Sequence, residues 1–595
     1  MIIRVVTSAM VPGFRVINCD VAYPWHWYRS CSVPYYLRLP ILNRYAPMMM
    51  IFCLPLIWTL LSACNAEPLP GRRQCNRCIA STFTTSLPNG ASIERISSVS
   101  AGGSYGEGTS DLGYPSDAQN LTAVCAVTVR VTVSPTSQYR FGLFLPRPAD
   151  WNGKFLAVGG YSQAGGINWP DMGQGPHYGF ATLSTDTGHN STAADLNWAT
   201  PDRLLDWGYR ALNGSVFLGK ALTKAYYREP IRYSYWSGCS TGGRQGLKEI
   251  QISPESFDGA LVGAPAWDTK HLFPWITKIA TYNLPVNDSK HLDLPQFGLL
   301  AAAVLAQCDG QDGLNDTIIP SPDTCKLDPT AIQCGDPRSN PTNCLSTAQV
   351  QTARNIYSDY ITGDGKFVSH GFTPGSENQW ATFLLSGALE DFDVRYERFW
   401  LYNDSSWPWT KYTDAVVTDS ERINPGNATA DAFDISAFKR RGGKVLMYHG
   451  LADGVVPTKS SDLYLNRTMK ALQSSNLQDF FRLFYVPGMA HCWFTQPEVN
   501  APWALGGAGQ ATQLLSQAAF GQGWSVPGYE GLAKYDALVA LMDWVEKGKA
   551  VESVVATTWN ATGNVSRQRP LCPWPKKAVY GGRGNTNLAD SWSCS

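Results

Sequence analysis

The chain has 595 residues, of which 44% are hydrophobic and 16% are charged, and its formal net charge at pH 7 is zero. The hydrophobic fraction is enough to bury a large core, and the balanced charge argues against a protein that binds nucleic acid or anionic membranes electrostatically. The length suits either several small domains or one long α/β enzyme, so length alone does not fix the domain count.

An apolar segment near the N-terminus predicts a secretory signal peptide at residues 48–66. It begins with three methionines, is apolar through its middle apart from Thr59, and ends in small residues that signal peptidase accepts. The apolar run is short for a membrane span, although an N-terminal anchor is the alternative. Because a signal normally begins a chain, we interpret residues 1–47 as a mis-assigned extension and expect a secreted protein with no membrane contact after cleavage. Ten Asn-x-Ser/Thr sequons support export, at Asn120, Asn190, Asn213, Asn287, Asn315, Asn403, Asn427, Asn466, Asn560 and Asn564.

A series of buried strands is predicted between residues 67 and 266, the first part of an α/β domain. Runs rich in β-branched and aromatic residues at 127–133, 139–145, 155–158 and 259–263 have the length and bounds of such strands.

A Gly-x-Ser-x-Gly turn at residues 238–242 directly follows another such run, at 231–235. In a strand–turn–helix setting, the two glycines allow the sharp bend and close packing that lift a serine side chain clear of the sheet. The motif also arises by chance in glycine-rich chains, so its weight depends on the residues that follow. Ser240 is the predicted nucleophile.

Residues 267–441 differ in character from the flanking sequence. They are rich in Pro, Asn, Asp and clustered cysteines, show no sustained strand alternation, and are too many for a loop. The segment begins after the nucleophile strand, so we predict an inserted lid domain over the active-site face. Short spacings in an oxidising compartment favour local disulfides, here Cys308–Cys325 and Cys334–Cys344.

Residues 442–595 are predicted to complete the α/β domain. The apolar runs 444–447 and 480–486 read as strands, and they are followed by Asp453 and His491. A helix is expected at 535–545, because its apolar residues fall on one face.

The chain order Ser, Asp, His is that of an α/β-hydrolase, so we predict this fold with a large inserted lid and the triad Ser240, Asp453 and His491. The imidazole takes the serine proton, and the carboxylate fixes the tautomer of the imidazole. His449 and His189 are rival bases, although His449 shares a loop with the carboxylate and more readily serves structure.

Acyl transfer also needs donors for the oxyanion. The backbone N–H of Thr241, next to the nucleophile, is one candidate, and Gly160, in the turn after the strand 155–158, is the other. A plain glycine turn is the alternative for the second.

The cysteines beside the serine and the histidine form a predicted disulfide, Cys239–Cys492, since the side chains of Ser240 and His491 must approach each other. Short spacing also predicts Cys572–Cys594. Cys125 is left for Cys78 or Cys75, and one of the eleven cysteines after residue 66 has no partner.

The Cys-Ser, Asp, His-Cys constellation resembles the fungal tannase and feruloyl esterase family, from about residue 75 to the C-terminus. The resemblance implies that the loop 309–318 is the family's calcium loop. Without this resemblance, we would interpret the loop as an acidic, solvent-exposed turn. Further matching pieces are Gly159-Gly160, Thr185-Asp186-Thr187-Gly188-His189, Gly263-Ala264-Pro265-Ala266 and Cys572-Pro573-Trp574-Pro575. The implied ligands of a structural Ca²⁺ are the carboxylates of Asp309, Asp312 and Asp316 and the carbonyls of Leu314 and Ile318.

The resemblance implies a secreted serine esterase that releases ferulate-type hydroxycinnamates from plant cell-wall polysaccharide. The alternative within the family is a tannase acting on galloyl esters, and the Cys-Pro-Trp-Pro ending looks more like the feruloyl branch. A non-catalytic binding protein on a hydrolase scaffold is the alternative of another class. Lid aromatics such as Trp400 and Trp407 are either stacking partners for an acyl ring or ordinary core.

Overall fold

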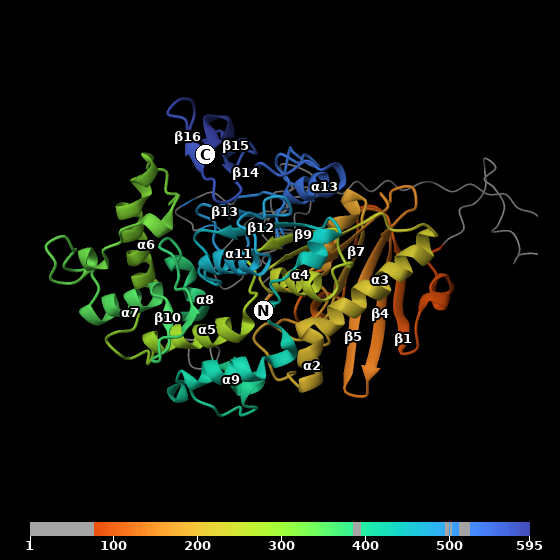
Figure 1. The fold of residues 1–595 in the computed structure, drawn as a ribbon, viewed down its shortest axis with the longest axis horizontal. Coiled ribbons are helices and arrows are strands. Elements are labelled where there is room, and N and C mark those ends of the chain that lie inside the picture. Colours follow the sequence, from red (N-terminus) through yellow and green to blue (C-terminus); the bar gives the residue numbers. More distant parts are fainter. Residues whose placement is uncertain are drawn as a thin grey trace, which may run out of the picture. The chain divides into compact units, whose positions relative to one another are not determined.

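A nine-stranded mixed sheet lies at the centre of the computed structural model (Figure 1), with the strand order β1-β4-β5-β7-β6-β8-β9-β12-β13. The strands β1, β4, β5 and β7 pair antiparallel, whereas those from β7 to β13 run parallel. The parallel half brings the carboxyl ends of β6, β8, β12 and β13 to one edge. The strands are β1 Ala91–Val99, β4 Val124–Ser134, β5 Ser137–Pro146, β6 Lys154–Val158, β7 Ala181–Thr185, β8 Tyr233–Cys239, β9 Gly259–Gly263, β12 Lys444–Gly450 and β13 Phe481–Val486.

The structure describes residues 77–384, 394–493, 495, 499, 503–510, 514 and 524–595. The predicted signal peptide 48–66, the extension 1–47 and Cys75 lie outside the described residues. Residues 76–595 form one unit by their contacts.

Helices cover both faces of the sheet, because alternate strand residues are apolar on each side. On β12, Val445 and Met447 join one core with α3, α4 and α11, while Leu446 and Tyr448 join a second core with α1 and α13. Figure 1 shows α3 and α4 lying along the sheet. These helices are α1 Trp169–Met172, α2 Pro201–Leu205, α3 Ala211–Tyr227, α4 Thr241–Ile252, α10 Ser436–Arg440, α11 Lys459–Ala471 and α13 Ala537–Lys547.

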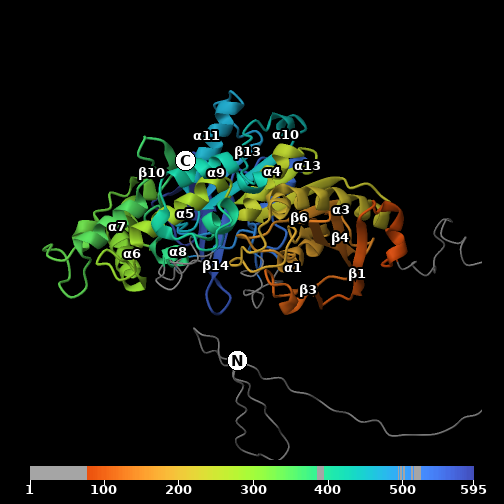
Figure 2. The same cartoon turned by 90° about the horizontal axis from the view of Figure 1, so that it is seen from below.

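The described residues of the predicted insertion, 267–384 and 394–441, are helical, with one small two-stranded sheet. Its residues share a third core with Leu196, Trp198 and Val456 from the sheet-bearing part, so the two parts pack against each other. Both views place α6 and α7 at the end of the unit away from β1 and β4 (Figures 1 and 2). The elements are α5 Thr269–Asn283, α6 Leu294–Cys308, α7 Thr347–Tyr357, β10 Tyr360–Ile361, β11 Phe367–Ser369, α8 Ala381–Leu384 and α9 Ala415–Ile423.

Short two-stranded sheets complete the fold. One of them, near the N-terminus of the unit, pairs β2 with β3, and two others form the C-terminal region. Their strands are β2 Gly103–Tyr105, β3 Ala118–Leu121, β14 Val554–Trp559, β15 Val565–Leu571, β16 Ala578–Tyr580 and β17 Trp592–Cys594.

The predicted α/β-hydrolase fold is confirmed, with a helix-covered sheet in which the nucleophile strand lies between β6 and β9. The nucleophile strand begins two residues later than predicted and extends to Cys239, and the C-terminal helix is shifted by two residues. The predicted division into hydrolase and lid domains stays a prediction.

Candidate active site

Ser240 occupies a strained turn between β8 and α4. Its backbone has φ 61° and ψ −123°, a conformation that non-glycine residues rarely adopt. The flanking glycines allow this bend, because a Cβ on Gly238 would lie 2.7 Å from the backbone of Gly242 and one on Gly242 would lie 2.9 Å from the Gly160 oxygen. The turn therefore presents the serine at the carboxyl edge of the sheet, as the motif predicts.

His491 and Asp453 are joined by a hydrogen bond of 2.7 Å from the imidazole Nδ1 to the carboxylate Oδ2. With Nδ1 donating, Nε2 is the ring atom able to accept a proton. Nε2 is buried and makes no hydrogen bond with any described residue. His491 and Ser240 line the same cavity, so the structure brings the three predicted residues to one site.

Asp453 is fixed in place as an ionised carboxylate. Its Oδ1 accepts the N–H groups of Val455 and Val456, both at 2.8 Å. Burial alone raises the pKa of this carboxyl, but the charges and hydrogen bonds of His491 and His449 hold the pKa well below its ordinary value. The carboxylate is therefore ready to stabilise an imidazolium at His491.

The two rival histidines lie where they serve the structure and not as the catalytic base. His449 is fully buried, and its Nε2 faces the Asp453 Oδ2 at 3.1 Å and the Val456 oxygen at 3.2 Å. Because both partners are acceptors, Nε2 carries the proton and His449 acts on the site through Asp453. His189 stacks on Trp198 at 3.7 Å, and burial lowers its pKa to about 4. Neither histidine lines the cavity of Ser240.

The predicted oxyanion donors differ in availability. Thr241 is the first residue of α4, so its N–H has no acceptor within the helix and lies at the positive end of the helix dipole. The Gly160 N–H donates to the Gln245 Oε1 at 3.0 Å, which ties the glycine turn to the nucleophile helix. Gly160 lines the cavity, but its N–H is engaged in this structure, and its role as a donor stays a prediction.

The predicted disulfide Cys239–Cys492 is present, with the two Cα atoms 5.9 Å apart. It connects the residue before Ser240 to the residue after His491. The other predicted bridges are also present, and Cys125 pairs with Cys78 rather than Cys75. These bridges are Cys78–Cys125, Cys308–Cys325, Cys334–Cys344 and Cys572–Cys594.

The cavity above Ser240 has a volume of about 690 Å³, within the usual range of small-molecule sites. The insertion supplies an apolar wall that includes Phe273, Phe383 and Tyr396. Trp400 and Trp407 are buried core residues outside the cavity lining, and Trp400 packs edge-on against Phe273 at 5.5 Å. These two tryptophans are therefore core residues and not stacking partners for an acyl ring, and the aromatic residues named above line the cavity instead.

Several polar residues of the cavity have no sequence signal. Asn168 donates to the Gly159 oxygen and to Asp171, both at 2.8 Å, and burial raises the pKa of Asp171 to about 6. Gln379, from the insertion, also lines the cavity. These residues lie far from the triad along the chain and belong to no recognisable motif, so only the tertiary structure identifies them.

The loop with the predicted calcium ligands is held by its own hydrogen bonds. Asp309 accepts the N–H groups of Asp316 and Thr317, and Asp312 accepts that of Leu314. Arg569 forms an ion pair with Asp316. Within the described part of the chain, no three His, Cys, Asp or Glu side chains are grouped to hold a metal ion. The predicted ligand set, which also counts the carbonyls of Leu314 and Ile318, stays a prediction.

The chain is similar to a known protein family and to several of its members. The family model described as tannase and feruloyl esterase matches residues 125–390 and 403–595. Probable feruloyl esterase B-1 of Aspergillus flavus is 33% identical over 476 residues, which are 79% of this chain and 86% of that protein. Probable feruloyl esterase B-2 of Aspergillus fumigatus is 34% identical over 478 residues, with the same coverage of 79% and 86%.

Two solved structures have similar folds. Feruloyl esterase B from Aspergillus oryzae is 28% identical with a TM-score of 0.77, and the alignment covers 87% of this chain and 99% of that one. Tannin acyl hydrolase from Aspergillus niger is 20% identical with a TM-score of 0.66, covering 87% and 95%. The second likeness concerns the fold alone.

Proposed function

The chain belongs to the tannase and feruloyl esterase family, and on that premise we propose the esters on which it acts and the role of each residue of its site. It is a carboxylic ester hydrolase, and since its relatives are named feruloyl esterases, we propose esters of ferulate-type hydroxycinnamic acids rather than galloyl esters as its substrates. The observation that carries the mechanism is the Asp453–His491 hydrogen bond beside the cavity that contains Ser240.

The reaction proceeds in two halves. Ser240 Oγ attacks the ester carbonyl carbon while His491 Nε2 takes the hydroxyl proton, and the resulting imidazolium is stabilised by Asp453. The oxyanion accepts a hydrogen bond from the Thr241 N–H. His491 then returns the proton to the leaving alcohol, and a water molecule activated by His491 releases the phenolic acid from Ser240.

We expect methyl ferulate and methyl caffeate to be hydrolysed with higher kcat/KM than methyl gallate. In cinnamoyl esters a two-carbon spacer separates the ring from the carbonyl, so one pocket cannot place both rings and both carbonyls equally well. The three esters should be compared in one assay, with a Ser240→Ala background. A much faster rate on gallate would assign the tannase activity instead, and no turnover by folded protein would favour the non-catalytic binding protein.

We also propose that the protein is exported and acts on phenolic esters of plant cell walls. The five disulfides among the described residues suit an oxidising compartment. Nine of the ten sequon asparagines are exposed, whereas the Asn213 side chain donates to Glu249 and Ser253 inside the fold. Among the described helices, none is long and apolar enough to cross a membrane.

Calcium at residues 309–318 remains a proposal with a structural role. Burial, with the neighbouring carboxylate of Asp316 adding to it, raises the pKa of Asp312, and a bound cation would favour its charged form. A bound ion would supply that charge and link the loop to the rest of the insertion. The ion pair between Arg569 and Asp316 already supplies part of this positive charge, so the metal content must be measured directly.

Asp312→Ala is expected to lower the melting temperature by about 3–6 °C and to reduce bound calcium, because weaker metal binding removes linked stability. The kcat of the folded enzyme should stay near the wild-type value. Elemental analysis and thermal unfolding with and without a chelator test this. Asp323→Ala, an exposed acidic residue of the insertion paired with Lys459, is the matched control. The calcium site would be refuted if the purified wild-type protein contains no calcium and its melting temperature does not change with the chelator.

A further inference from the structure

Gln379 connects the two loops that carry the acid and the base of the triad. Its side-chain Oε1 accepts the N–H of Gly454 at 2.9 Å and the N–H of His491 at 3.0 Å. Gly454 directly follows Asp453, so a single oxygen atom from the insertion fixes the backbone beside the carboxylate and the backbone of the base.

The loop after Asp453 packs directly on the turn that carries Gln379. A Cβ at Gly454 would lie 2.8 Å from the Ser376 oxygen and 2.9 Å from the Gln379 Cβ. Any other residue at position 454 would push these two segments apart. The backbone of Gly454 therefore packs directly against the Ser376 oxygen and the Gln379 Cβ, with little room to shift.

The turn is held by side-chain hydrogen bonds, both within itself and to the loop of the carboxylate. The buried Trp380 donates from Nε1 to the Ser376 Oγ at 3.0 Å, and Ser376 donates to the Thr373 oxygen at 2.7 Å. Thr373 in turn donates to the oxygen of Leu451, two residues before Asp453, at 2.7 Å. The segment 373–380 thus holds the loop of the carboxylate at a second point.

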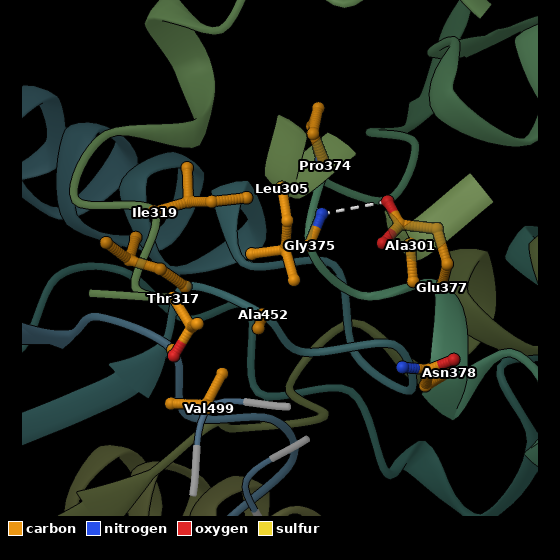
Figure 3. Close-up of a pocket in the computed structure, with 12 residues that line it drawn as sticks. Ala301, Leu305, Thr317, Ile319, Pro374, Gly375, Glu377, Asn378, Ala452 and Val499 are labelled. Atoms are coloured by element: carbon orange, nitrogen blue, oxygen red, sulfur yellow. Dashed lines mark hydrogen bonds between the residues drawn. The ribbon is translucent and has the colours of Figure 1, made fainter. Parts of the chain in front are cut away.

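Figure 3 shows the residues around a small cavity beside this turn. Glu377 accepts the N–H of Gly375 at 2.8 Å, the bond drawn there, and also the hydroxyl of Tyr357 at 2.8 Å. Gly375, Glu377 and Ala452 line a cavity with a volume of about 30 Å³, which is enough for a water molecule. This small cavity lies between the segment 373–380 and the loop of the carboxylate, where the two pack together.

We propose that Gln379 is a positioning residue, which sets the backbone of His491 relative to Asp453 and thereby completes the triad from the insertion. This inference rests on the proposed esterase function. Gln379 acts through His491 rather than on the reacting atoms, and Asp453 and the disulfide at Cys492 also restrain the base. Because small displacements of a catalytic group reduce the rate strongly, the effect falls on kcat rather than on substrate binding.

The test compares Gln379→Ala, Gln379→Glu and Gln307→Ala on methyl ferulate and on p-nitrophenyl acetate, with thermal unfolding of each. We expect Gln379→Ala to lower kcat by about 10–100-fold with little change in KM. Gln379→Glu keeps an acceptor for both N–H groups and should recover most of kcat. Its added charge should move the acid limb of the pH profile upward, because it stabilises the protonated base next to Asp453 and His449.

Gln307→Ala is the matched control. The Gln307 side chain also forms a hydrogen bond with the backbone of the insertion, because it accepts the N–H of Asp328 at 2.8 Å. It does not line the cavity of Ser240. Its kcat should equal that of the wild type.

A Gln379→Ala kcat within about twofold of the wild type, or an equal loss in Gln307→Ala, would overturn the role of Gln379. If Gln379→Ala does not fold, Gln379→Glu decides: an unshifted acid limb overturns the inference and a shifted one supports it. The wild type is measured first on both esters. No turnover there would overturn the esterase function together with this inference, whereas equal turnover in Gln379→Ala overturns the inference alone.

Discussion

Ser240→Ala is expected to lower kcat on the order of a million-fold while the protein remains folded. Without the hydroxyl, no acyl-enzyme forms, and only the oxyanion donors and substrate binding remain to assist water. The strained backbone at position 240 is kept by the surrounding glycines, so alanine fits the turn without rearrangement. Measurement of kcat and of thermal unfolding on the same preparation checks both statements.

The other triad positions give a graded series. His491→Ala should match the loss at Ser240, because the two residues act as a unit, and Asp453→Asn should lose on the order of ten-thousand-fold by leaving the wrong tautomer. Ser234→Ala, on the nucleophile strand, is the control. A folded Ser240→Ala protein with near-normal turnover would exclude the serine mechanism. Labelling by a phosphonate inhibitor should modify the peptide that contains Ser240 in the wild type only.

The sequence predicts the elements whose pattern is local. The strands β4, β5, β6, β9, β12 and β13 lie close to their predicted ranges, because each is an apolar run of strand length. The strand β7 escaped prediction since it is buried yet polar, with Thr182, Ser184 and Thr185 inside the fold. Thr185 satisfies its hydroxyl by donating to the Arg140 oxygen, a partner on another strand that no local pattern specifies.

The site divides in the same way. Ser240 and the cysteines beside the triad follow from motif and order, whereas Gln379 and Asn168 enter through tertiary contacts alone. The Gly159–Gly160 turn illustrates the boundary: its place beside the nucleophile helix is predictable, but the engagement of the Gly160 N–H by Gln245 is not. Residues that act through backbone atoms of distant loops leave no periodicity or spacing for sequence analysis to detect.

The disulfide Cys239–Cys492 is expected to be required for activity rather than only for stability. It closes a separation of 253 residues, which in the chain-entropy model restricts the unfolded chain by about 5.5 kcal/mol, an upper figure because other cross-links already shorten that chain. The local geometry matters more. Cys492 has φ 66° and Ser240 has φ 61°, so the bridge joins the ends of two strained segments.

Replacing both cysteines by alanine should leave a folded protein whose kcat is lower by about 100-fold or more. Without the bridge, the backbone at position 492 can relax from its left-handed conformation and carry His491 away from Ser240, and only the hydrogen bonds to Gln379 and Asp453 described above then resist this movement. Cys334→Ala with Cys344→Ala removes a bridge of the insertion and should retain activity. Full activity in the Cys239/Cys492 double variant, or nonreducing peptide mapping that finds either cysteine free in the wild type, would show that the bridge does not position the base.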